Sequence, residues 1–482
     1  MNQRRPFKKP FAQEKSRNPE RDFSPRKHNG EETTDLGSEK FSSLMREVAG
    51  EMGLKDQLDL EPAPLATLDY EKELELKNAT LRKFWELHNL PDKPSLVVPS
   101  PLPRHYRSTS KRRLYRKGPS WKWEERVGGG KSREDAGILE PAEHAAIYKQ
   151  ALEKLNEEPY RNLANSLNFL ILRGAPELMV IFNVFRLNAD VVRKAKLLTE
   201  HLAQRSENKV AAAHLFYDAT RSSYYIEARV SPGPFRVKRL FGPEFLPIEV
   251  EGIRYFLHPT GFFQVNPSIL PRVLEEVQNA LKPQKGDRFL DLFCGCGLFT
   301  VPVARFCQTA WGVEGSSVAC DSARQSAGLQ KIRNTHFVAG KLEAKHLPKL
   351  LPRQDGNPEI LLLDPPRQGT EIGLINALAE RKPRRIVQLF CGMDVMPMEI
   401  GRWRKQGYMV AKVLPFDMFP GTANLEVMVV LLPDKYGLLN RKPPGRSISE
   451  NDQGPLFRPM QSSSPGKGFL RRQAMKKNQR RR

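Results

Sequence analysis

The sequence predicts an α/β protein in which a doubly wound, Rossmann-like sheet follows an α+β substrate domain. Over residues 256–435, short apolar runs alternate with helix-length segments, which is typical of a parallel sheet covered on both faces. Residues 61–255 mix strand-like and helix-like patterns and form the expected substrate domain. Residues 1–60 and 436–482 are polar and rich in Arg and Pro, so we expect disordered basic ends there.

The substrate domain should begin with a helix and continue mainly with strands. Apolar residues at helical spacing within residues 65–90 predict that first helix, and residues 191–205 have the spacing of a second one. Apolar runs bounded by turn residues, such as those at 173–176, predict the strands. The expected strands cover residues 168–172, 178–184, 215–217, 224–230 and 235–240.

The second domain should contain seven strands with helices between most of them. The expected strands cover residues 288–293, 309–313, 336–338, 360–363, 385–390, 408–415 and 425–432. The expected helices lie within residues 298–306, 316–332, 371–379 and 396–406. The last two strands follow each other without a helix, so they should close the sheet as an antiparallel pair. Ligands of such sheets bind at the carboxyl ends of the strands, near the switch in strand order.

Composition excludes several classes of protein. The 482 residues suffice for two or three domains and resemble neither collagen nor a disulfide-rich scaffold. No apolar run approaches the ~20 residues that cross a bilayer, and the first thirty residues lack the apolar core of a signal peptide. All five cysteines lie between Cys294 and Cys391 and form no disulfide framework. We therefore expect a cytoplasmic protein without a membrane partner.

The net charge of +23 is concentrated in three segments. Residues 1–30, 101–131 and 436–482 carry net charges of +6, +8 and +10, which indicates a polyanionic partner. The two ends by themselves could equally be solubilising tails. In the middle segment the cations alternate with aromatic residues, among them Tyr106, Tyr115, Trp121 and Trp123. Because cations neutralise phosphates and rings stack on unpaired bases, this segment favours RNA over an anionic membrane.

A glycine loop follows the first strand of the second domain. In Asp291-Leu-Phe-Cys-Gly-Cys-Gly297 the two glycines let the backbone turn tightly and approach a ligand. A dinucleotide fingerprint needs a third glycine where Thr300 stands, and no Lys-Ser/Thr pair of a phosphate-binding loop follows. Glu314 ends the next strand, where a carboxylate can accept both hydroxyls of a ribose. The combination indicates an adenosine cofactor without a pyrophosphate, namely S-adenosylmethionine; the alternative is that Glu314 only caps a helix.

Three further polar residues lie where strands of the second domain begin or end. Asp364 is followed by Pro365-Pro366-Arg367, and two prolines make a rigid turn that projects its carboxylate from the strand. Cys391 ends the fifth strand, and Glu426 lies near the start of the last one. These positions can converge over one pocket at the edge of the sheet. The alternatives are a buried apolar cysteine and a strand-edge acid.

These motifs resemble those of the S-adenosylmethionine-dependent RNA uracil-5-methyltransferases, which act on tRNA or ribosomal RNA. The resemblance implies that the sheet is a Rossmann-like methyltransferase sheet. A weaker similarity to the central domain of the family lies at His105-Tyr-Arg107. The matching motifs, in the order of the family, are Gly261-Phe-Phe-Gln-Val-Asn-Pro267, Asp291 to Gly297, Leu363-Asp-Pro-Pro-Arg367, Leu389-Phe-Cys391, and Phe416-Asp-Met-Phe-Pro420 through Glu426.

The resemblance also implies a role for each of six residues. Four of them would hold the cofactor and position the target: Gln264, Phe293, Glu314 and Asp364. Cys391 would be the nucleophile and Glu426 the general base. A thiolate that adds to carbon-6 of uracil makes carbon-5 nucleophilic, and a carboxylate can then remove the carbon-5 proton. The expected activity is methyl transfer to carbon-5 of a uridine in rRNA or tRNA.

Two departures from the family keep another class of function open. Gly392-Met393 follow Cys391 where the family usually has Asn-Pro, and Asn424 stands where it usually has His. The alternative is an RNA-binding assembly factor whose methyltransferase fold is inactive.

We predict no metal site. Cys294 and Cys296 have no second ligand pair at zinc spacing, and the nine histidines show no ligand spacing. Some members of the family hold an iron–sulfur cluster on early cysteines, but no cysteine precedes Cys294. We therefore expect no iron–sulfur cluster, and we expect a monomer.

Overall fold

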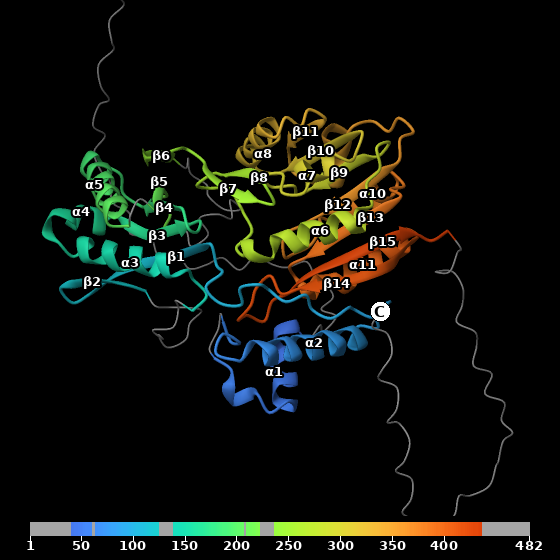
Figure 1. The fold of residues 1–482 in the computed structure, drawn as a ribbon, viewed down its shortest axis with the longest axis horizontal. Coiled ribbons are helices and arrows are strands. Elements are labelled where there is room, and N and C mark those ends of the chain that lie inside the picture. The colour runs from blue at the N-terminus through green and yellow to red at the C-terminus, as the bar shows by residue number, and fades with distance from the viewer. Residues whose placement is uncertain (1–39, 60–62, 125–137, 207–208, 222–235, 436–482) are drawn as a thin grey trace, which may run out of the picture. The chain divides into compact units, whose positions relative to one another are not determined.

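The computed structural model describes residues 40–59, 63–124, 138–206, 209–221 and 236–435. The strand predicted at 224–230, the first 39 residues and the basic tail from 436 lie outside the described residues. The described strands form a seven-stranded sheet, a six-stranded sheet and a two-stranded hairpin (Figure 1). A helix with the length and apolar character of a membrane span does not occur among the described residues.

The seven-stranded sheet has the order β11-β10-β9-β12-β13-β15-β14. Its strands are β9 (Arg288–Leu292), β10 (Thr309–Glu314), β11 (Thr335–Ala339), β12 (Glu359–Leu363), β13 (Arg385–Phe390), β14 (Tyr408–Phe416) and β15 (Glu426–Pro433). The first five strands pair in parallel, and β15 pairs antiparallel with both β13 and β14. The strand order reverses between β9 and β12, as in a doubly wound sheet. The predicted fold class and the antiparallel closing pair are confirmed.

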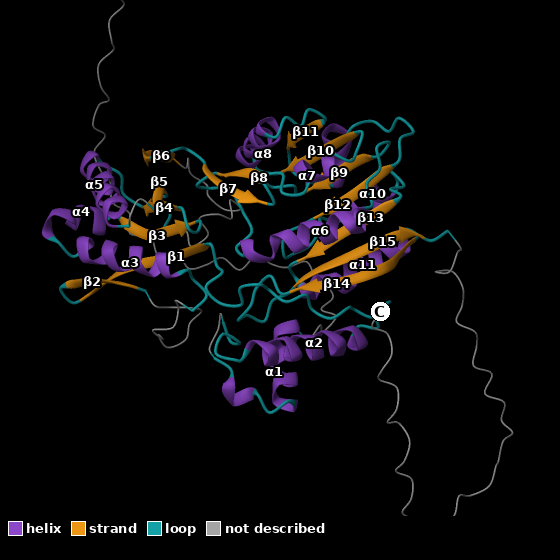
Figure 2. Cartoon of the chain, in the orientation of Figure 1, coloured by secondary structure: helices purple, strands orange, loops and turns teal. Residues whose placement is uncertain are grey.

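Helices cover both faces of this sheet, as Figure 2 shows. Side chains alternate between the faces, so Phe289 and Leu362 pack on one face and Leu290 and Leu361 on the other. The first face is covered by α6 (Leu270–Leu281), α7 (Thr300–Ala304) and α8 (Ser317–Leu329). The second face is covered by α9 (Leu347–Leu350), α10 (Leu374–Ala379), α11 (Met396–Lys405) and two N-terminal helices. Three predicted helices, α7, α8 and α10, are shorter than expected, and α10 begins only after Gly373, which has a left-handed φ of 81°.

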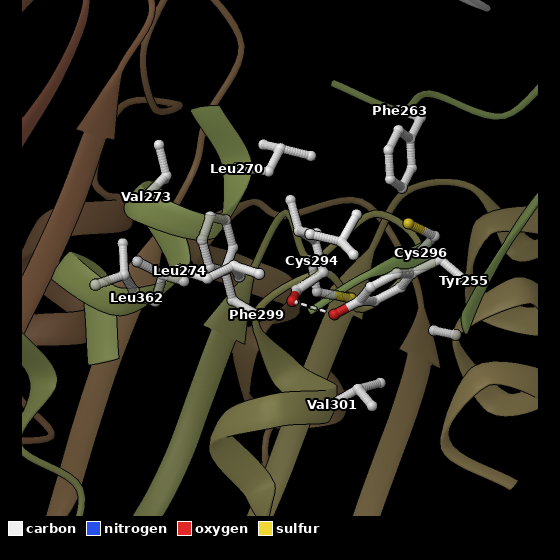
Figure 3. Close-up of a cluster of buried hydrophobic side chains, with 14 of the residues drawn as sticks. Tyr255, Phe263, Leu270, Val273, Leu274, Cys294, Cys296, Phe299, Val301 and Leu362 are labelled. Carbon is white, nitrogen blue, oxygen red and sulfur yellow. Dashed lines mark hydrogen bonds between the residues drawn. The ribbon is translucent and has the colours of Figure 1, made fainter. Parts of the chain in front are cut away.

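Figure 3 shows the core beside the glycine loop. Tyr255 lies on β8 (Ile253–Leu257), which pairs with β7 (Leu246–Val250) in the hairpin. The hydroxyl of Tyr255 donates to the carbonyl of Leu298 at 3.0 Å, so the hairpin is tied to the loop that follows β9. Cys294 and Cys296 are buried in this cluster and pack beside the glycine loop.

The six-stranded sheet has the order β2-β1-β3-β4-β5-β6. Its strands are β1 (Thr109–Lys117), β2 (Ser120–Trp123), β3 (Leu167–Arg173), β4 (Leu178–Val184), β5 (Val210–Tyr217) and β6 (Arg236–Phe241). One face packs on α3 (Ala142–Leu155), α4 (Arg161–Ala164) and α5 (Ala189–Arg205). Residues of the other face, such as Phe169 and Ile181, share a core with the β7–β8 hairpin and α6. Except for residues 224–230, the predicted strands of the substrate domain are confirmed, with β5 longer than expected.

The N-terminal helices correct one prediction. We expected disorder through residue 60, but α1 (Phe41–Glu51) and a short 3-10 turn (Lys55–Gln57) lie in that segment. The apolar side chains of α1 recur at helical spacing and pack on α2 (Tyr70–Leu87); the Phe41 and Phe84 rings meet edge to face at 5.4 Å. The apolar stripe of a single amphipathic helix was hidden in a segment whose overall composition is polar.

Candidate active site

Three adjacent strands end in line, and the residues after them form one side of the candidate site. Leu292 pairs with Val313 on one side and with Leu363 on the other. The next residues, Phe293, Glu314 and Asp364, therefore meet at the same edge of the sheet. Backbone bonds continue this alignment, because the N–H of Asp364 donates to the Leu292 carbonyl at 3.2 Å. The structure thus brings together three of the four residues that we expected to hold the cofactor.

The glycine loop is fastened to Glu314. Its carboxylate accepts the N–H of Gly295 at 3.1 Å and the N–H of Ser316 at 2.9 Å, and each oxygen keeps a further lone pair. The side chain of Ser316 accepts from the N–H of Ala319 and is the N-cap of α8. Glu314 therefore does more than cap a helix: it joins the loop after β9 to the end of β10.

Cys391 and Glu426 lie beside each other on two antiparallel strands. Phe390 pairs with Val427, so Cys391 and Glu426 are the next residues across β13 and β15. Cys391 is half-buried, and its Sγ lies 4.0 Å from the carbonyl oxygen of Pro365 in the turn after β12. Glu426 is 3% exposed, and its Oε1 has no hydrogen-bond partner among the described residues. The expected nucleophile and the expected base thus share the edge where β12 ends.

The site holds more negative than positive groups. Burial, with the charges of Asp364 and Glu314, raises the pKa of Asp291 to about 8. Burial and the charge of Glu314 raise the pKa of Asp364 to about 7. Burial also raises the pKa of Glu426, with a further contribution from Asp364. Such shifts favour protonated carboxyls and indicate that a cation would bind favourably at this place.

The Cys391 thiol shares this environment. Burial and the charges of Glu426 and Asp364 raise its pKa, while the guanidinium of Arg367 acts in the opposite direction. Arg367 also lowers the pKa of Glu426. The thiol of the ligand-free protein is therefore protonated, and a positive charge at the site would make the thiolate accessible.

Asp291 begins the glycine-loop motif and belongs to the same group of acids, although no role was assigned to it from the sequence. It is fully buried, its Oδ2 accepts from the hydroxyl of Thr300 at 2.5 Å, and its Oδ1 has no partner among the described residues. The available signal was its position as the penultimate residue of a buried strand that neighbours the strand of Glu314.

Gln264 stands apart from the other predicted site residues. Its backbone carbonyl accepts from the Ser108 hydroxyl at 3.5 Å, and within the described part of the chain its side chain makes no hydrogen bond. Asn266 of the same motif is buried and donates to the carbonyl of Met418 at 3.2 Å. The Gln264 motif is therefore joined to the motif that precedes Glu426, through a residue that the sequence did not single out.

Close packing favours glycine directly after Cys391 in this structure. A Cβ on Gly392 would lie 2.4 Å from the carbonyl oxygen of Arg367, because the turn after β12 packs against the backbone there. Its φ of −116° is open to any residue, so space and not conformation is the reason. The departure from the Asn of the family thus accompanies a close approach of the two strand-end turns.

A buried network supports the same two turns. Glu399 of α11 accepts the N–H of Thr370 at 2.5 Å and its hydroxyl at 2.6 Å, and it also accepts from the amide of Gln388 on β13. The indole N–H of Trp403 donates to Gln388 at 2.7 Å. These contacts hold the strand of Cys391 against the loop after Arg367.

At the other departure, the Asn424 amide donates to the Thr422 hydroxyl at 3.2 Å.

The basic middle segment is partly structural, which corrects our expectation that its cations and rings face RNA. Arg104 donates to the carbonyls of residues 65, 66 and 68. The buried ring of Tyr106 donates its hydroxyl to the Pro420 carbonyl at 2.9 Å, and the buried Trp123 donates to the Tyr148 carbonyl. Burial of these groups follows from contacts with residues far along the chain, which the alternating pattern does not reveal.

The far end of β1 keeps the expected character. Tyr115, Arg116 and Lys117 are exposed on this strand, and Arg113 lies over the ring of Phe169 at 4.8 Å. The exposed cations at this end of the strand can reach a polyanion.

Comparisons with known proteins agree with this geometry. Residues 226–434 match the model of the tRNA (uracil-5-)-methyltransferase family. The predicted family resemblance is confirmed for this segment, which contains the six residues given a role above.

Two relatives illustrate the similarity in sequence. A 23S rRNA (uracil(1939)-C(5))-methyltransferase of Hahella chejuensis is 34% identical over 245 residues, which is 48% of this chain and 53% of that protein. A 23S rRNA (uracil(747)-C(5))-methyltransferase of Cronobacter sakazakii is 34% identical over 181 residues, 38% of this chain and 46% of that protein. The chain spans about half the length of the curated relatives it matches.

One solved structure shares the fold over most of the chain. It is a Pyrococcus abyssi tRNA (uracil-54, C5)-methyltransferase in complex with S-adenosyl-L-homocysteine, with a TM-score of 0.57 and 20% identity. The match covers 77% of this chain and 86% of that one. At this identity the likeness shows the fold, which agrees with a methyltransferase sheet preceded by a second domain.

Proposed function

We propose that this chain transfers a methyl group from S-adenosylmethionine to carbon-5 of a uridine in tRNA or rRNA, through a covalent bond between Cys391 and the base. The observation that carries the proposal is the pairing of β13 with β15. It puts Cys391 next to Glu426 at the edge where β9, β10 and β12 also end. The family match over residues 226–434 supports the class of reaction.

The acidic groups at this edge suit the cofactor. Glu314 has lone pairs left for ribose hydroxyls, Asp291 has an unpartnered buried oxygen, and the raised pKa of Asp364 would fall beside a cation. We propose that these residues hold the cofactor together with Phe293 and Gln264. When bound, S-adenosylmethionine supplies a methyl group activated by a positively charged sulfonium.

Cys391 and Glu426 would act on the base in turn. The thiolate of Cys391 adds to carbon-6, and the electron pair of the double bond between carbons 5 and 6 makes carbon-5 nucleophilic. Once carbon-5 carries the methyl group, the carboxylate of Glu426 takes the carbon-5 proton. The electron pair of the broken carbon-5–hydrogen bond restores the double bond and expels the thiolate. Arg367 assists both residues, because it lowers both pKa values.

Residues outside the strand-end site would hold the RNA. We propose that the exposed end of β1, with Tyr115, Arg116 and Lys117, contacts the RNA backbone or an unpaired base. The target uridine has to leave its stack, at a cost of a few kcal/mol that is lowest in loops. Several expectations stay predictions. They are the substrate domain at 61–255, the catalytic domain at 256–435, the cytoplasmic location, the monomer and the lack of an iron–sulfur cluster.

Covalent trapping tests this proposal. The full-length chain is incubated with S-adenosylmethionine and with tRNA or rRNA that contains 5-fluorouracil, whose carbon-5 has no proton to lose. We expect a protein–RNA band that resists denaturation in the wild type and in Cys307→Ala, where a buried cysteine ahead of Thr309, at the opposite end of β10, is replaced. The band should be lost in Cys391→Ala. If the wild type forms no such band with either class of RNA, the proposal is wrong.

The departures at Gly392 and Asn424 keep the inactive RNA-binding factor as the second candidate. Calorimetric titration with S-adenosylmethionine separates the two. Saturable binding, weakened by Asp364→Asn, supports the enzyme. RNA binding without cofactor binding supports the inactive factor.

A further inference from the structure

A buried ionic cluster joins α2 to the segment that precedes Glu426. We call Glu73, Lys77, Arg104 and Asp417 the α2 cluster. The ammonium of Lys77 donates to Glu73 Oε1 and to Asp417 Oδ1, both at 2.7 Å. A guanidinium nitrogen of Arg104 lies 2.9 Å from Glu73 Oε2. The side chains of Glu73, Lys77 and Asp417 are 0% exposed, so α2 is joined by charge to a residue 340 positions further along the chain.

The cluster is balanced in formal charge. Two carboxylates face two cations, and the third donor of Lys77 lies 3.4 Å from the carbonyl oxygen of Phe419. Tyr70, at the start of α2, donates its hydroxyl to Asp417 at 3.1 Å. Removal of one partner from such a group leaves an uncompensated buried charge, so the cluster resists any displacement of residues 416–421 from α2.

Residues 416–421 are held by several other parts of the chain as well. The N–H of Gly421 donates to Glu73 at 2.6 Å. The carbonyl of Pro420 accepts from Tyr106, and the carbonyl of Met418 accepts from Asn266. A Cβ on Gly421 would lie 2.9 Å from a methyl group of Leu139, so the packing there is close too. Phe416 at the start of this segment pairs with Glu426, which begins β15 after residues 422–425.

We propose that Lys77 is a positioning residue that holds residues 416–421 so that Glu426 faces carbon-5 of the target uridine. The inference rests on the proposed function. α2 lies outside the segment matched by the family model, 226–434, so an N-terminal helix of this chain would be part of the catalytic arrangement. Lys77 touches no reacting atom and acts through Asp417, Phe419 and Glu73.

The proposal predicts which chemical step depends on Lys77. Cys391 directly follows β13, which is held through its Gln388 by Glu399 and Trp403 of the other network. Loss of the Lys77 ammonium should therefore spare the addition of the thiolate to carbon-6. It should slow the removal of the carbon-5 proton by Glu426, and with it the release of the thiolate. The covalent protein–RNA species should then accumulate on ordinary uridine RNA.

The test compares full-length wild type, Lys77→Met and Lys77→Met/Asp417→Asn on ordinary RNA and on 5-fluorouracil RNA. For Lys77→Met we expect kcat to fall about 10- to 100-fold, since misplacement of a reacting group by about 1 Å costs that much. KM for S-adenosylmethionine should change little, and the covalent band should appear on ordinary RNA. The double variant removes both charges of one pair and should recover part of kcat. Tyr70→Phe, which loses one bond to Asp417, should show the same effect in weaker form if Lys77→Met does not fold.

The outcomes separate the two proposals. If wild type forms no band on 5-fluorouracil RNA, the proposed function and this inference both fail. If wild type forms it and folded Lys77→Met has the kcat of wild type, the inference alone is overturned. It is overturned too if folded Lys77→Met forms the band on neither RNA, because that result shows a general structural defect and not a slowed proton removal.

Discussion

The α2 cluster and the strand-end site both bury carboxylates, yet they treat them in opposite ways. In the cluster, Glu73 and Asp417 each contact the ammonium of Lys77, and Arg104 adds a second cation. At the site, four acids gather, and the opposing cation is the exposed Arg367. The four acids are Asp291, Glu314, Asp364 and Glu426.

The difference separates a structural element from a reactive one. A balanced buried group holds segments in place, because any displacement exposes or unpairs a charge. An unbalanced group keeps carboxylate oxygens without a hydrogen-bond partner, such as Oδ1 of Asp291 and Oε1 of Glu426 in the described chain. Such a group takes up a proton or a cation. The balanced α2 cluster contacts residues 416–421, and the chain then continues to Glu426 at the strand-end site.

The largest effect should come from breaking the balanced cluster. Lys77→Met leaves Asp417 and Glu73 without their shared ammonium, and we expect the free energy of unfolding to fall by about 3–5 kcal/mol. Chemical denaturation followed by circular dichroism measures it. Lys77→Met/Asp417→Asn should lose clearly less than the single variant. Equal losses in both would show that packing of the Lys77 stem, and not charge, holds α2.

The site should depend on backbone packing where the cluster depends on charge. Gly392→Ala puts a Cβ 2.4 Å from the Arg367 carbonyl, so we expect a loss of about 1–3 kcal/mol in the free energy of unfolding. Gly401→Ala in α11 is the matched control, because a Cβ there meets nothing within 4 Å, and we expect a gain of about 0.5–1 kcal/mol. A Gly392→Ala protein as stable as wild type would mean that the two turns are free to separate.

The excess of acids should make the ligand-free protein less stable as the pH rises. The folded pKa values of about 7 for Asp364 and about 8 for Asp291 lie above the value near 4 of an unfolded chain. The stability contributed by these protonated carboxyls is therefore fully present below about pH 4 and is lost as the pH rises through about 7 to 8. Scanning calorimetry should show a fall of the order of a few degrees in melting temperature from about pH 6 to about pH 9. Asp364→Asn should reduce that fall; an unchanged fall would assign it to other groups.

The smallest effect concerns the thiol. Arg367 lowers the pKa of Cys391 from an exposed position, so Arg367→Gln should slow alkylation of Cys391 by iodoacetamide about two- to fivefold at constant pH. Mass spectrometry identifies the alkylated residue, and the other four cysteines are buried. Arg353→Gln, an exposed cation ahead of the opposite end of β12, is the control and should leave the rate unchanged. If both variants react alike, Arg367 has no specific influence on the thiol.

Much of the second domain was readable from the sequence for a definite reason. Parallel strands buried on both faces are near-continuous apolar runs, so β12 and β13 were expected within one residue of their observed bounds. The strand ends then pointed to Glu314, Asp364, Cys391 and Glu426, because parallel strands carry their ligands at one edge. α1 was missed, since its apolar stripe is short and lies in a charged segment.

The supports of the site were not readable in the same way. Lys77 meets a carboxylate 340 residues away, and Glu399 meets Thr370 through a helix and a turn. A lysine in an amphipathic helix and a glutamate in another are ordinary surface residues by pattern. Arg104 and Tyr106 even suggested the opposite role, because buried and exposed cations look alike in a sequence.

What the sequence by itself determined is the succession of the strands along the chain, the residues at their ends and the family resemblance of residues 226–434, since these depend on local pattern and spacing. The tertiary structure alone decided which charges are neutralised and which are left open. Charge compensation depends on distances between groups remote in the chain and on the burial that excludes water from them. Those quantities exist only once the chain has folded.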